Sequence, residues 1–219
     1  GYLSATRVWA EQQGTPDAWK KWWVDPDGET YYFQGKDNVP FHTIIWPAIL
    51  LAYGGLNLPT DVVANEYLNL GGIDFSKSHG HAVWLPDFLT RYEPDPLRYY
   101  LASIMPETSD SEFTWEGFVA ANNNELVATF GNFVHRVLTI TTRNFDNCVP
   151  NPAKLDTSDQ SALDACDTAL KEVSTAIEAR HFRDGLRAAM ELARHGNRYI
   201  DSKEPWKLVK TDKKSAGTA

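Results

Sequence analysis

The stretch TYYFQGKDNVP, residues 30–40, gives the strongest indication of the fold. Its first four residues are an aromatic, β-favouring run of the length expected for a buried strand, and Gly35 bounds that run. The segment 38–40 then indicates the start of a helix. A second β-rich run, DVVANEYL, follows at residues 61–68. A strand, a helix and another strand in this order predict a βαβ unit with a parallel sheet.

Two further local signals flank this unit. Thr15-Pro16-Asp17 has the pattern of a helix cap followed by proline at the first helical position, so a helix is expected from Pro16 through Trp23. The turn sequence DPDG at residues 25–28 should end it. Pro47 lies inside the helix expected after residue 38 and should kink or bend it, because proline lacks the N–H of the helical hydrogen bond.

After Pro106 the sequence changes to helical periodicity. Three apolar stripes follow one another: Leu126, Phe130, Phe133, Val137 and Ile140; Leu163, Cys166, Leu170, Val173 and Ile177; and Phe182, Leu186, Ala189 and Ala193. Thr157-x-x-Gln160 has the form of a capping box before the second stripe, and residues 147–154 have the composition of a loop. The predicted fold class is α/β plus all-α, with an antiparallel helix bundle in the second half.

Composition limits the classes of protein. The chain has 219 residues, 42% of them hydrophobic, and a formal net charge of -8. An acidic chain is unsuited to non-specific binding of nucleic acid, although a few placed side chains could still read an RNA. Cys148 and Cys166 are the only cysteines, which excludes a four-cysteine zinc site within this sequence and favours a reducing cytoplasm. No apolar run is long enough for a membrane span, and residues 1–6 do not resemble a secretory signal.

The segment GGIDFSKSHG, residues 71–80, is the first candidate site. Lys77 between Ser76 and Ser78 could place an ammonium and two hydroxyls around a phosphate. The glycines of this loop would let its backbone come close to a ligand. An exposed lysine at a hairpin tip is the alternative interpretation.

A second candidate site lies where the first strand meets its helix, the place where open α/β sheets bind ligands. Gly35 admits a ligand close to the backbone and Asp37 could accept hydrogen bonds from ribose hydroxyls, unless the segment is only an Asx turn that caps the helix. Asn38 and His42 are four residues apart and should share one side of the helix. His42 could equally be a structural residue.

The third candidate site is in the bundle. Asn132 and Arg136, one helical turn apart, carry planar polar groups suited to reading base edges, or they are ordinary surface residues. Trp206 follows Pro205 among Lys203, Lys207 and Lys210. An exposed indole among cations could stack on single-stranded RNA, or it could fold back onto the bundle.

Taken in order, these segments resemble the methionyl-tRNA synthetases, which are class I aminoacyl-tRNA synthetases. In the first half, the resemblance is carried by YYFQGKDNVPFH at residues 31–42 with Trp46-Pro47-Ala48, and by NEYL at residues 65–68 leading into FSKS at residues 75–78, which is similar to that family's KMSKS loop. In the second half, it is carried by FTWE at residues 113–116, GN at 131–132, RHGN at 194–197 and EPW at 204–206. Each motif is moderately specific, whereas their order and spacing together are highly specific.

The resemblance implies roles for single residues. It places Tyr2, Asn38 and His42 in the methionine pocket, Gly35 and Asp37 at the ribose of ATP, Ser76, Lys77 and Ser78 at the ATP phosphates with Lys77 as the catalytic residue, and Asn132, Arg136 and Trp206 at the anticodon. The sequence departs from the family pattern at Asp74, where the first lysine of KMSKS is expected, and at His79, where arginine is frequent.

The resemblance also implies a partial enzyme. The HIGH signature and the zinc knuckle of the family belong upstream of Gly1. We therefore expect residues 1–105 to be the second half of a Rossmann-like catalytic domain and residues 106–219 to be a connecting segment with most of the anticodon bundle, its final helix missing. Half a doubly wound sheet would expose hydrophobic strands, so the N-terminal half, as another chain or as upstream sequence, is expected as a partner.

The implied function is a cytoplasmic methionine–tRNA ligase, with methionine, ATP and tRNA(Met) as its partners, Mg²⁺ accompanying ATP, and no metal bound by this chain itself. The rival from another class is a non-catalytic tRNA-binding or scaffold module that has lost its chemistry. A related ligase for another apolar amino acid fits less well, because the Trp206 motif is specific to the family.

Overall fold

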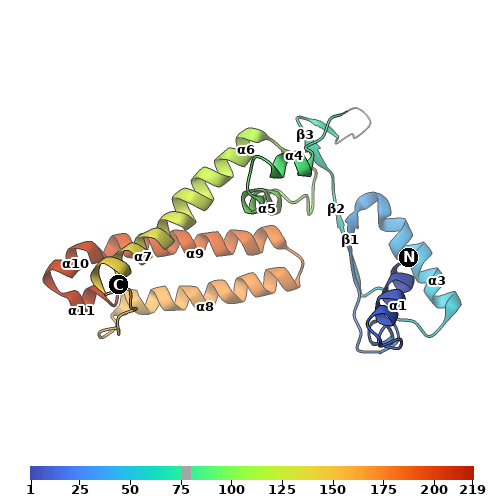
Figure 1. Ribbon diagram of the computed structural model, residues 1–219, viewed down its shortest axis with the longest axis horizontal. Helices are drawn as coiled ribbons and strands as arrows, with labels where there is room; N and C mark the ends of the chain where they lie inside the picture. The colour runs from blue at the N-terminus through green and yellow to red at the C-terminus, as the bar shows by residue number, and fades with distance from the viewer. Residues whose placement is uncertain (75–79) are drawn as a thin grey trace. The chain divides into compact units, whose positions relative to one another are not determined.

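The computed structural model describes residues 1–74 and 80–219 (Figure 1). The chain divides into two compact units, one of residues 1–67 and 106–111, the other of residues 68–105 and 112–219. A small parallel sheet in the first unit and a helical region that extends to the C-terminus agree with the α/β plus all-α class expected from the sequence.

The first unit contains the predicted βαβ arrangement. Its elements are α1 (Tyr2–Gln12), α2 (Lys20–Trp23), β1 (Tyr31–Gly35), η1 (Lys36–Asn38), η2 (Phe41–Ile45), α3 (Trp46–Tyr53) and β2 (Asp61–Asn65). Strands β1 and β2 pair in parallel, with Tyr31 opposite Asp61 and Gly35 opposite Asn65. The parallel pairing confirms the prediction made from residues 30–68.

The connection between these strands contains the distortion expected at Pro47. It opens with the 3₁₀ turn η1, widens into the π-helical turn η2, and continues as α3. In a regular α-helix the ring of Pro47 would press against the carbonyl of Thr43, to which proline has no N–H to donate. The helix meets this constraint with a wide turn immediately before Pro47.

The helix predicted from Pro16 through Trp23 is shorter in the structure, where only Lys20–Trp23 is helical. Thr15 does not cap it. The backbone N–H of Thr15 donates to the carbonyl oxygen of Ala10 at 3.0 Å, which closes the end of α1 instead. Helix α1 itself carried no signal that we recognised in the sequence. Its buried residue, Ala10, lies in the interior of this unit, as do Trp23, Tyr32 and Leu50.

The second unit begins with a short sheet and a compact core. Its elements are β3 (Leu68–Leu70), β4 (Ile73–Asp74), α4 (Leu85–Leu89), α5 (Pro94–Ser103), β5 (Ser111–Phe113), α6 (Trp115–Ala120), η3 (Ala121–Gly131), α7 (Asn132–Asn144), α8 (Thr157–Glu178), α9 (Phe182–Lys203), α10 (Pro205–Thr211) and α11 (Lys213–Ala216). The strand order is β4-β3-β5. The core is formed by Phe88, Leu97, Tyr100, Phe113, Phe118 and Ala121.

The first predicted bundle helix is present but is not α-helical throughout. The helix runs without a break from Trp115 to Asn144, and its middle part, η3, has π-helical hydrogen bonding. At Gly131 an added Cβ would lie 2.9 Å from the carbonyl oxygen of Leu126, five residues earlier. The wide turns and this close carbonyl explain why glycine suits the position.

Helices α8 and α9 form the predicted antiparallel pair. Residues 179–181 join them, and the two helices lie side by side in Figure 1. The capping box at the start of α8 is one residue earlier than predicted. Asp156 is the cap and Asp159 its partner, not Thr157 and Gln160, because Asp156 accepts from the backbone N–H of Asp159 at 3.0 Å while Asp159 accepts from that of Asp156 at 2.8 Å.

The apolar stripe predicted on α8 is largely exposed. Leu163, Leu170 and Ile177 are 51%, 70% and 50% exposed, whereas the small side chain of Ala169 is buried. Helix α9 is the main neighbour of α8 among the described residues. A helix packed against a single neighbour buries one narrow face, so the opposite apolar face stays open.

Among the described residues, no helix is both long enough and apolar enough to cross a membrane. Cys148 and Cys166 are both free thiols with exposed side chains.

Candidate active site and anticodon-binding surface

Tyr2 and His42, expected together from the resemblance, are in direct contact. His42 lies in the π turn η2 and Tyr2 begins α1, and the Tyr2 hydroxyl is 2.8 Å from Nε2 of His42. The other ring nitrogen, Nδ1, lies 3.0 Å from the carbonyl oxygen of Asn38. A carbonyl can only accept, so Nδ1 carries a proton, and in the neutral ring Nε2 accepts from the Tyr2 hydroxyl.

Aromatic rings surround this pair. Tyr2 meets Tyr32 edge to face at a centroid distance of 5.2 Å and Trp46 at 6.0 Å. The indole N–H of Trp46 donates to the Tyr32 hydroxyl at 2.8 Å, and burial raises the pKa of Tyr32. The contacts therefore produce an aromatic cluster of Tyr2, Tyr32, His42 and Trp46, suited to an apolar side chain with a polar end. Tyr32 and Trp46 were not among the site residues predicted from the sequence.

Gly35 and Asp37 lie at the end of β1, where the sequence placed them. Gly35 ends the strand and is exposed, with no atom within 4 Å of the position a Cβ would occupy. Asp37 is in η1 and does not cap the helix. Its Oδ1 accepts a hydrogen bond of 2.6 Å from the hydroxyl of Tyr67. The interpretation of this segment as a plain Asx turn is therefore wrong.

A charged network surrounds Asp37. Lys36 donates to Glu66 and, at 3.2 Å, to Oδ1 of Asp110. The same Oδ1 accepts the backbone N–H of Tyr67 at 2.9 Å. The Tyr67 N–H and the Lys36 ammonium lower the pKa of Asp110, and the bond to Glu66 raises the pKa of Lys36. Glu66 and Tyr67 belong to the NEYL motif but were not predicted as site residues, and Asp110 had no signal in the sequence.

The phosphate-loop candidates Ser76, Lys77 and Ser78, like His79, lie outside the described residues. The structure does describe the approach to them. Strands β3 and β4 form an antiparallel hairpin in which Asn69 faces Asp74. Gly71 and Gly72 turn this hairpin with φ of 61° and 76°, backbone angles that favour glycine.

Asn132, Arg136 and Trp206 come together through α7, α9 and α10. The guanidinium of Arg136 lies 5.1 Å from the centroid of the Trp206 ring, which is 40% exposed. Asn197 of α9 connects Asn132 with Arg136. Its Oδ1 accepts from Nδ2 of Asn132 at 3.2 Å and from Arg136 at 3.5 Å.

Asn197 and Asp201 were not predicted as site residues, although Asn197 belongs to the RHGN motif that carries the resemblance. The amide nitrogen of Asn197 donates to the carbonyls of Thr129 and Ala193, at 2.9 and 3.1 Å, which fixes the direction of its oxygen. Asp201 forms a salt bridge of 2.5 Å with Arg136. Both side chains hold polar groups of α7 in place from α9.

Two of the three cations expected around Trp206 are engaged elsewhere. Lys203 forms salt bridges with Asp156 at 2.7 Å and with Asp159 at 2.5 Å, and Lys207 pairs with Glu204 at 2.6 Å. The described cation on the indole face is Arg136. The site thus presents a half-exposed aromatic ring, a guanidinium and an amide, groups that can stack on and hydrogen-bond an unpaired base.

In residues 1–74 and 80–219, no group of three or more His, Cys, Asp or Glu side chains is arranged to hold a metal ion.

Comparisons with known proteins identify the family of this chain. A family model described as tRNA synthetases class I (M) matches residues 1–138, and one described as the anticodon binding domain of methionyl tRNA ligase matches residues 149–219. The chain is 52% identical over its whole length to the methionine–tRNA ligase of Thermomicrobium roseum, and 48% identical to that of Pyrococcus abyssi. It spans 38% and 32% of those two proteins.

A solved structure is similar too. The methionyl-tRNA synthetase of Mycobacterium tuberculosis bound by methionyl-adenylate superposes with a TM-score of 0.79 at 26% identity, over 88% of this chain and 38% of that one. A sheet–helix unit joined to an anticodon-binding helical region, matched by the class I model over more than half of the sequence, defines a class I aminoacyl-tRNA synthetase. Within that class, the chain belongs to the methionyl family.

Proposed function

We propose that this chain provides the second half of the catalytic domain and most of the anticodon-binding domain of a methionine–tRNA ligase. The observation that supports the proposal best is the identity of about one residue in two, over the full chain, to methionine–tRNA ligases. The enzyme would activate methionine with ATP and transfer it to tRNA(Met). Because the chain spans less than two fifths of those relatives, the activity belongs to the whole protein.

In the amino-acid pocket, Tyr2, Asn38 and His42 would bind methionine. The aromatic cluster favours an unbranched apolar side chain with a polarisable sulfur, which packs well against ring edges. His42, held by the Asn38 carbonyl, presents Nε2 and the Tyr2 hydroxyl as a coupled polar pair. This arrangement supports methionine over a purely aliphatic amino acid.

In the activation step, an oxygen of the methionine carboxylate attacks the α-phosphorus of ATP, and the bond to pyrophosphate breaks. Gly35 and Asp37 would hold the ribose, and Ser76, Lys77 and Ser78 would hold the phosphates. Lys77 is the proposed catalytic residue, because an ammonium at the triphosphate opposes the charge that builds up on the leaving pyrophosphate. Mg²⁺ would arrive with ATP as part of the substrate.

In tRNA recognition, Asn132, Arg136 and Trp206 would bind the anticodon. The contacts of Asn132 and Arg136 with Asn197, and of Arg136 with Trp206, support this assignment, because a preorganised set of groups loses less freedom when it binds an unpaired base.

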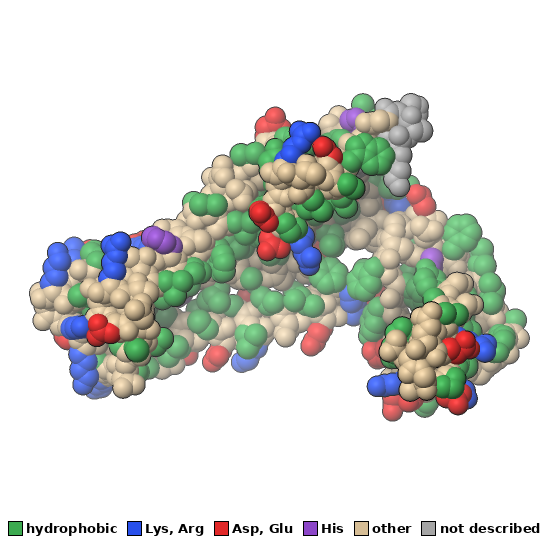
Figure 2. Space-filling view, viewed as in Figure 1, with side chains coloured by type: hydrophobic (Ala, Val, Ile, Leu, Met, Phe, Trp, Pro, Cys, Tyr) green, Lys and Arg blue, Asp and Glu red, His purple; other side chains and the backbone are tan. Residues whose placement is uncertain are grey.

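We propose the same domain organisation as the sequence indicated. Residues 1–105 would form the second half of a Rossmann-like catalytic domain with its KMSKS-type loop, and residues 106–219 the connecting segment and the antiparallel anticodon bundle. Exposed apolar side chains on η2 and α3 (Figure 2), among them Ile44, Ile49 and Leu51, suit a surface that the N-terminal half of the enzyme covers. The whole enzyme would act in the cytoplasm, with any zinc in its N-terminal part.

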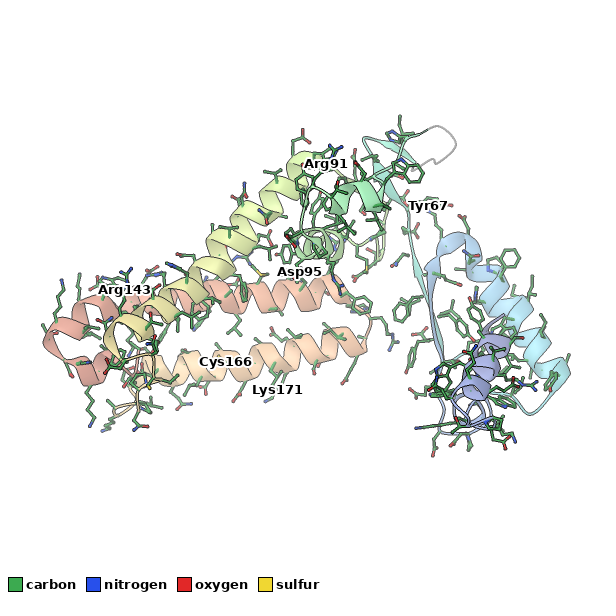
Figure 3. All side chains as sticks on the ribbon, viewed as in Figure 1. Tyr67, Arg91, Asp95, Arg143, Cys166 and Lys171 are labelled. Atoms are coloured by element: carbon green, nitrogen blue, oxygen red, sulfur yellow. The ribbon has the colours of Figure 1, made fainter. Side chains whose placement is uncertain are left out.

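The test is methionine-dependent ATP–pyrophosphate exchange by the full enzyme with Lys77→Ala. Loss of one charge-stabilising group at the transition state should lower kcat by about a hundredfold to a thousandfold, with little change in KM for methionine. Lys171→Ala, on the exposed surface of α8 (Figure 3), is the matched control and should leave exchange unchanged. A wild-type enzyme that binds tRNA(Met) but shows no exchange would instead be the non-catalytic module.

A further inference from the structure

The proposed ribose ligand Asp37 is held by a residue far away in the sequence. Tyr67, labelled in Figure 3, follows strand β2, and its hydroxyl donates to Oδ1 of Asp37 at 2.6 Å. Asp37 itself is exposed, in a turn of only three residues, η1. An exposed carboxylate on a short turn has several rotamers, and a strong hydrogen bond from a fixed donor selects one of them.

Tyr67 is fixed from three directions. Its backbone N–H donates to Oδ1 of Asp110 at 2.9 Å, and its carbonyl accepts from the backbone N–H of Ser111 at 2.9 Å. The ammonium of Lys36 lies 4.1 Å from the centroid of its ring. The backbone of Tyr67 is therefore held by residues 110 and 111, whereas its ring and its hydroxyl both contact the turn η1.

Lys36 in turn is held by two carboxylates, those of Glu66 and Asp110. Lys36 precedes Asp37 directly, so the anchored ammonium fixes the backbone of η1 while the Tyr67 hydroxyl fixes the carboxylate. The turn that carries Asp37 is thus clamped to the end of β2 and to residues 106–111.

We infer that Tyr67 is a positioning residue for nucleotide binding, and that it acts by orienting the Asp37 carboxylate toward the ribose hydroxyls of ATP. The inference rests on the proposed function, in which Asp37 binds the ribose. A carboxylate has lone pairs on both oxygens, so the bond from Tyr67 leaves acceptor capacity for a ribose hydroxyl. A donor on the carboxylate also reduces the energetic cost of desolvating it when the nucleotide enters.

The experiment uses Tyr67→Phe in the full enzyme. The substitution keeps the ring over Lys36 and the backbone bond to Asp110, and it removes the hydroxyl. Methionine-dependent pyrophosphate exchange is measured with ATP, 2′-deoxy-ATP and 3′-deoxy-ATP, and the quantity of interest is kcat/KM for ATP divided by that for each deoxynucleotide. In the wild type this ratio reports the hydrogen bond between a ribose hydroxyl and its acceptor.

We expect the ratio for at least one deoxynucleotide to fall about tenfold in Tyr67→Phe, as the loss of a hydrogen bond to a charged group implies. KM for methionine should change less than about twofold, because the methionine pocket does not involve Tyr67. Tyr31→Phe is the matched control. The Tyr31 hydroxyl also donates to a carboxylate in the same unit, that of Glu29 at 2.7 Å, and its removal should leave the ratios unchanged.

Three further outcomes would overturn the inference, and the first two separate it from the proposed function. If Asp37→Ala abolishes the discrimination between ATP and its deoxy forms while Tyr67→Phe preserves it, Asp37 binds the ribose without help from Tyr67 and the inference is wrong. If discrimination persists in Asp37→Ala, the ribose assignment itself fails, and the role of Tyr67 fails with it. An equal loss of kcat/KM for all three nucleotides in Tyr67→Phe would mean that the hydroxyl serves only the fold.

Discussion

Replacement of Lys203 by methionine tests the packing of the bundle most directly. The Lys203 side chain is 15% exposed and its ammonium bridges Asp156 and Asp159, of which Asp159 is almost completely buried, with 6% of its side chain exposed. Lys203→Met keeps the length of the side chain and leaves the Asp159 carboxylate buried without its cation. Helices α8 and α9 would lose the ionic contact between the start of one and the end of the other.

The size of the stability loss in Lys203→Met depends on the contacts that Asp159 keeps. Removal of one partner of a buried ion pair typically costs about 3–5 kcal/mol. Asp159 keeps hydrogen bonds from the Tyr199 hydroxyl at 2.7 Å and from the backbone N–H of Asp156 at 2.8 Å, so we expect the lower end of that range. A loss of about 3 kcal/mol lowers the melting temperature of a chain of this size by roughly 6–12 °C.

The stabilisation by the Lys203 ion pairs should decrease at low pH. Burial alone would raise the pKa of Asp159, but the Lys203 ammonium, the backbone N–H of Asp156 and the Tyr199 hydroxyl together lower it, and Lys203 is the main cause of the lowered pKa of Asp156. A carboxyl group whose pKa is depressed in the folded state stabilises the protein above its unfolded pKa, about 3.9, and that stabilisation disappears as the pH falls through the folded pKa. The melting temperatures of wild type and Lys203→Met should therefore differ fully at pH 6–7 and converge below about pH 4.

Far-UV circular dichroism of thermal unfolding, from pH 3 to pH 8, measures both effects. Lys207→Met is the matched control, because Lys207 lies one turn further on and its salt bridge with Glu204 is exposed, so its melting temperature should stay within about 1 °C of the wild type. Equal shifts for the two variants, or a shift in Lys203→Met that persists unchanged at pH 3, would refute the argument from the buried ion pair.

Two other substitutions have clear expected results. Gly196→Ala in α9 would place a Cβ 2.5 Å from the Phe133 ring, so we expect the free energy of unfolding, measured in urea, to fall by about 1–3 kcal/mol. Gly185→Ala in the same helix meets ordinary contacts and should be tolerated, and equal stability of the two variants would contradict the close packing of α7 and α9. Trp206→Ala should weaken binding of tRNA with a CAU anticodon about tenfold to a hundredfold at fixed salt, through loss of base stacking, while Lys210→Ala should have a much smaller effect. If Trp206→Ala weakens binding of a tRNA with another anticodon equally, the tryptophan is structural.

Local signals in the sequence predicted the parallel strands and the long bundle helices, but they missed α1 and did not fix where the helices begin. The β-rich runs at residues 30–33 and 61–68 predicted the parallel strands, and the apolar stripes predicted the long helices. At the start of α8, however, Asp156 and Thr157 are both good helix caps. The structure uses Asp156, which also binds Lys203 from the end of α9, and that partner lies 47 residues away in the sequence.

Periodicity also could not show which face of a helix would be covered. The spacing of Leu163, Leu170 and Ile177 correctly places them on one side of α8, yet their burial depends on which neighbours pack there. For the site residues too, membership of a site could be predicted, whereas the contacts between distant residues could not. The resemblance predicted that Tyr2 and His42 share one site and that Arg136 and Trp206 share another. Tyr67 and Asn197 belong to the NEYL and RHGN motifs, but their contacts with Asp37 and Asn132, 30 and 65 positions away, are tertiary and no local pattern predicts them.

The π-helical segment η3 has a consequence for how this domain can vary in length. A regular helix transmits every inserted or deleted residue as a rotation of all the side chains beyond it. A stretch of wide turns instead takes up an additional residue locally, so that the helices on either side keep their orientation. The segment Ala121–Gly131 lies directly before Asn132 and Arg136, and the carbonyl of Thr129 within it binds Asn197. Changes of one residue in the length of this segment can therefore be absorbed upstream of the two polar side chains, which keep their direction toward α9.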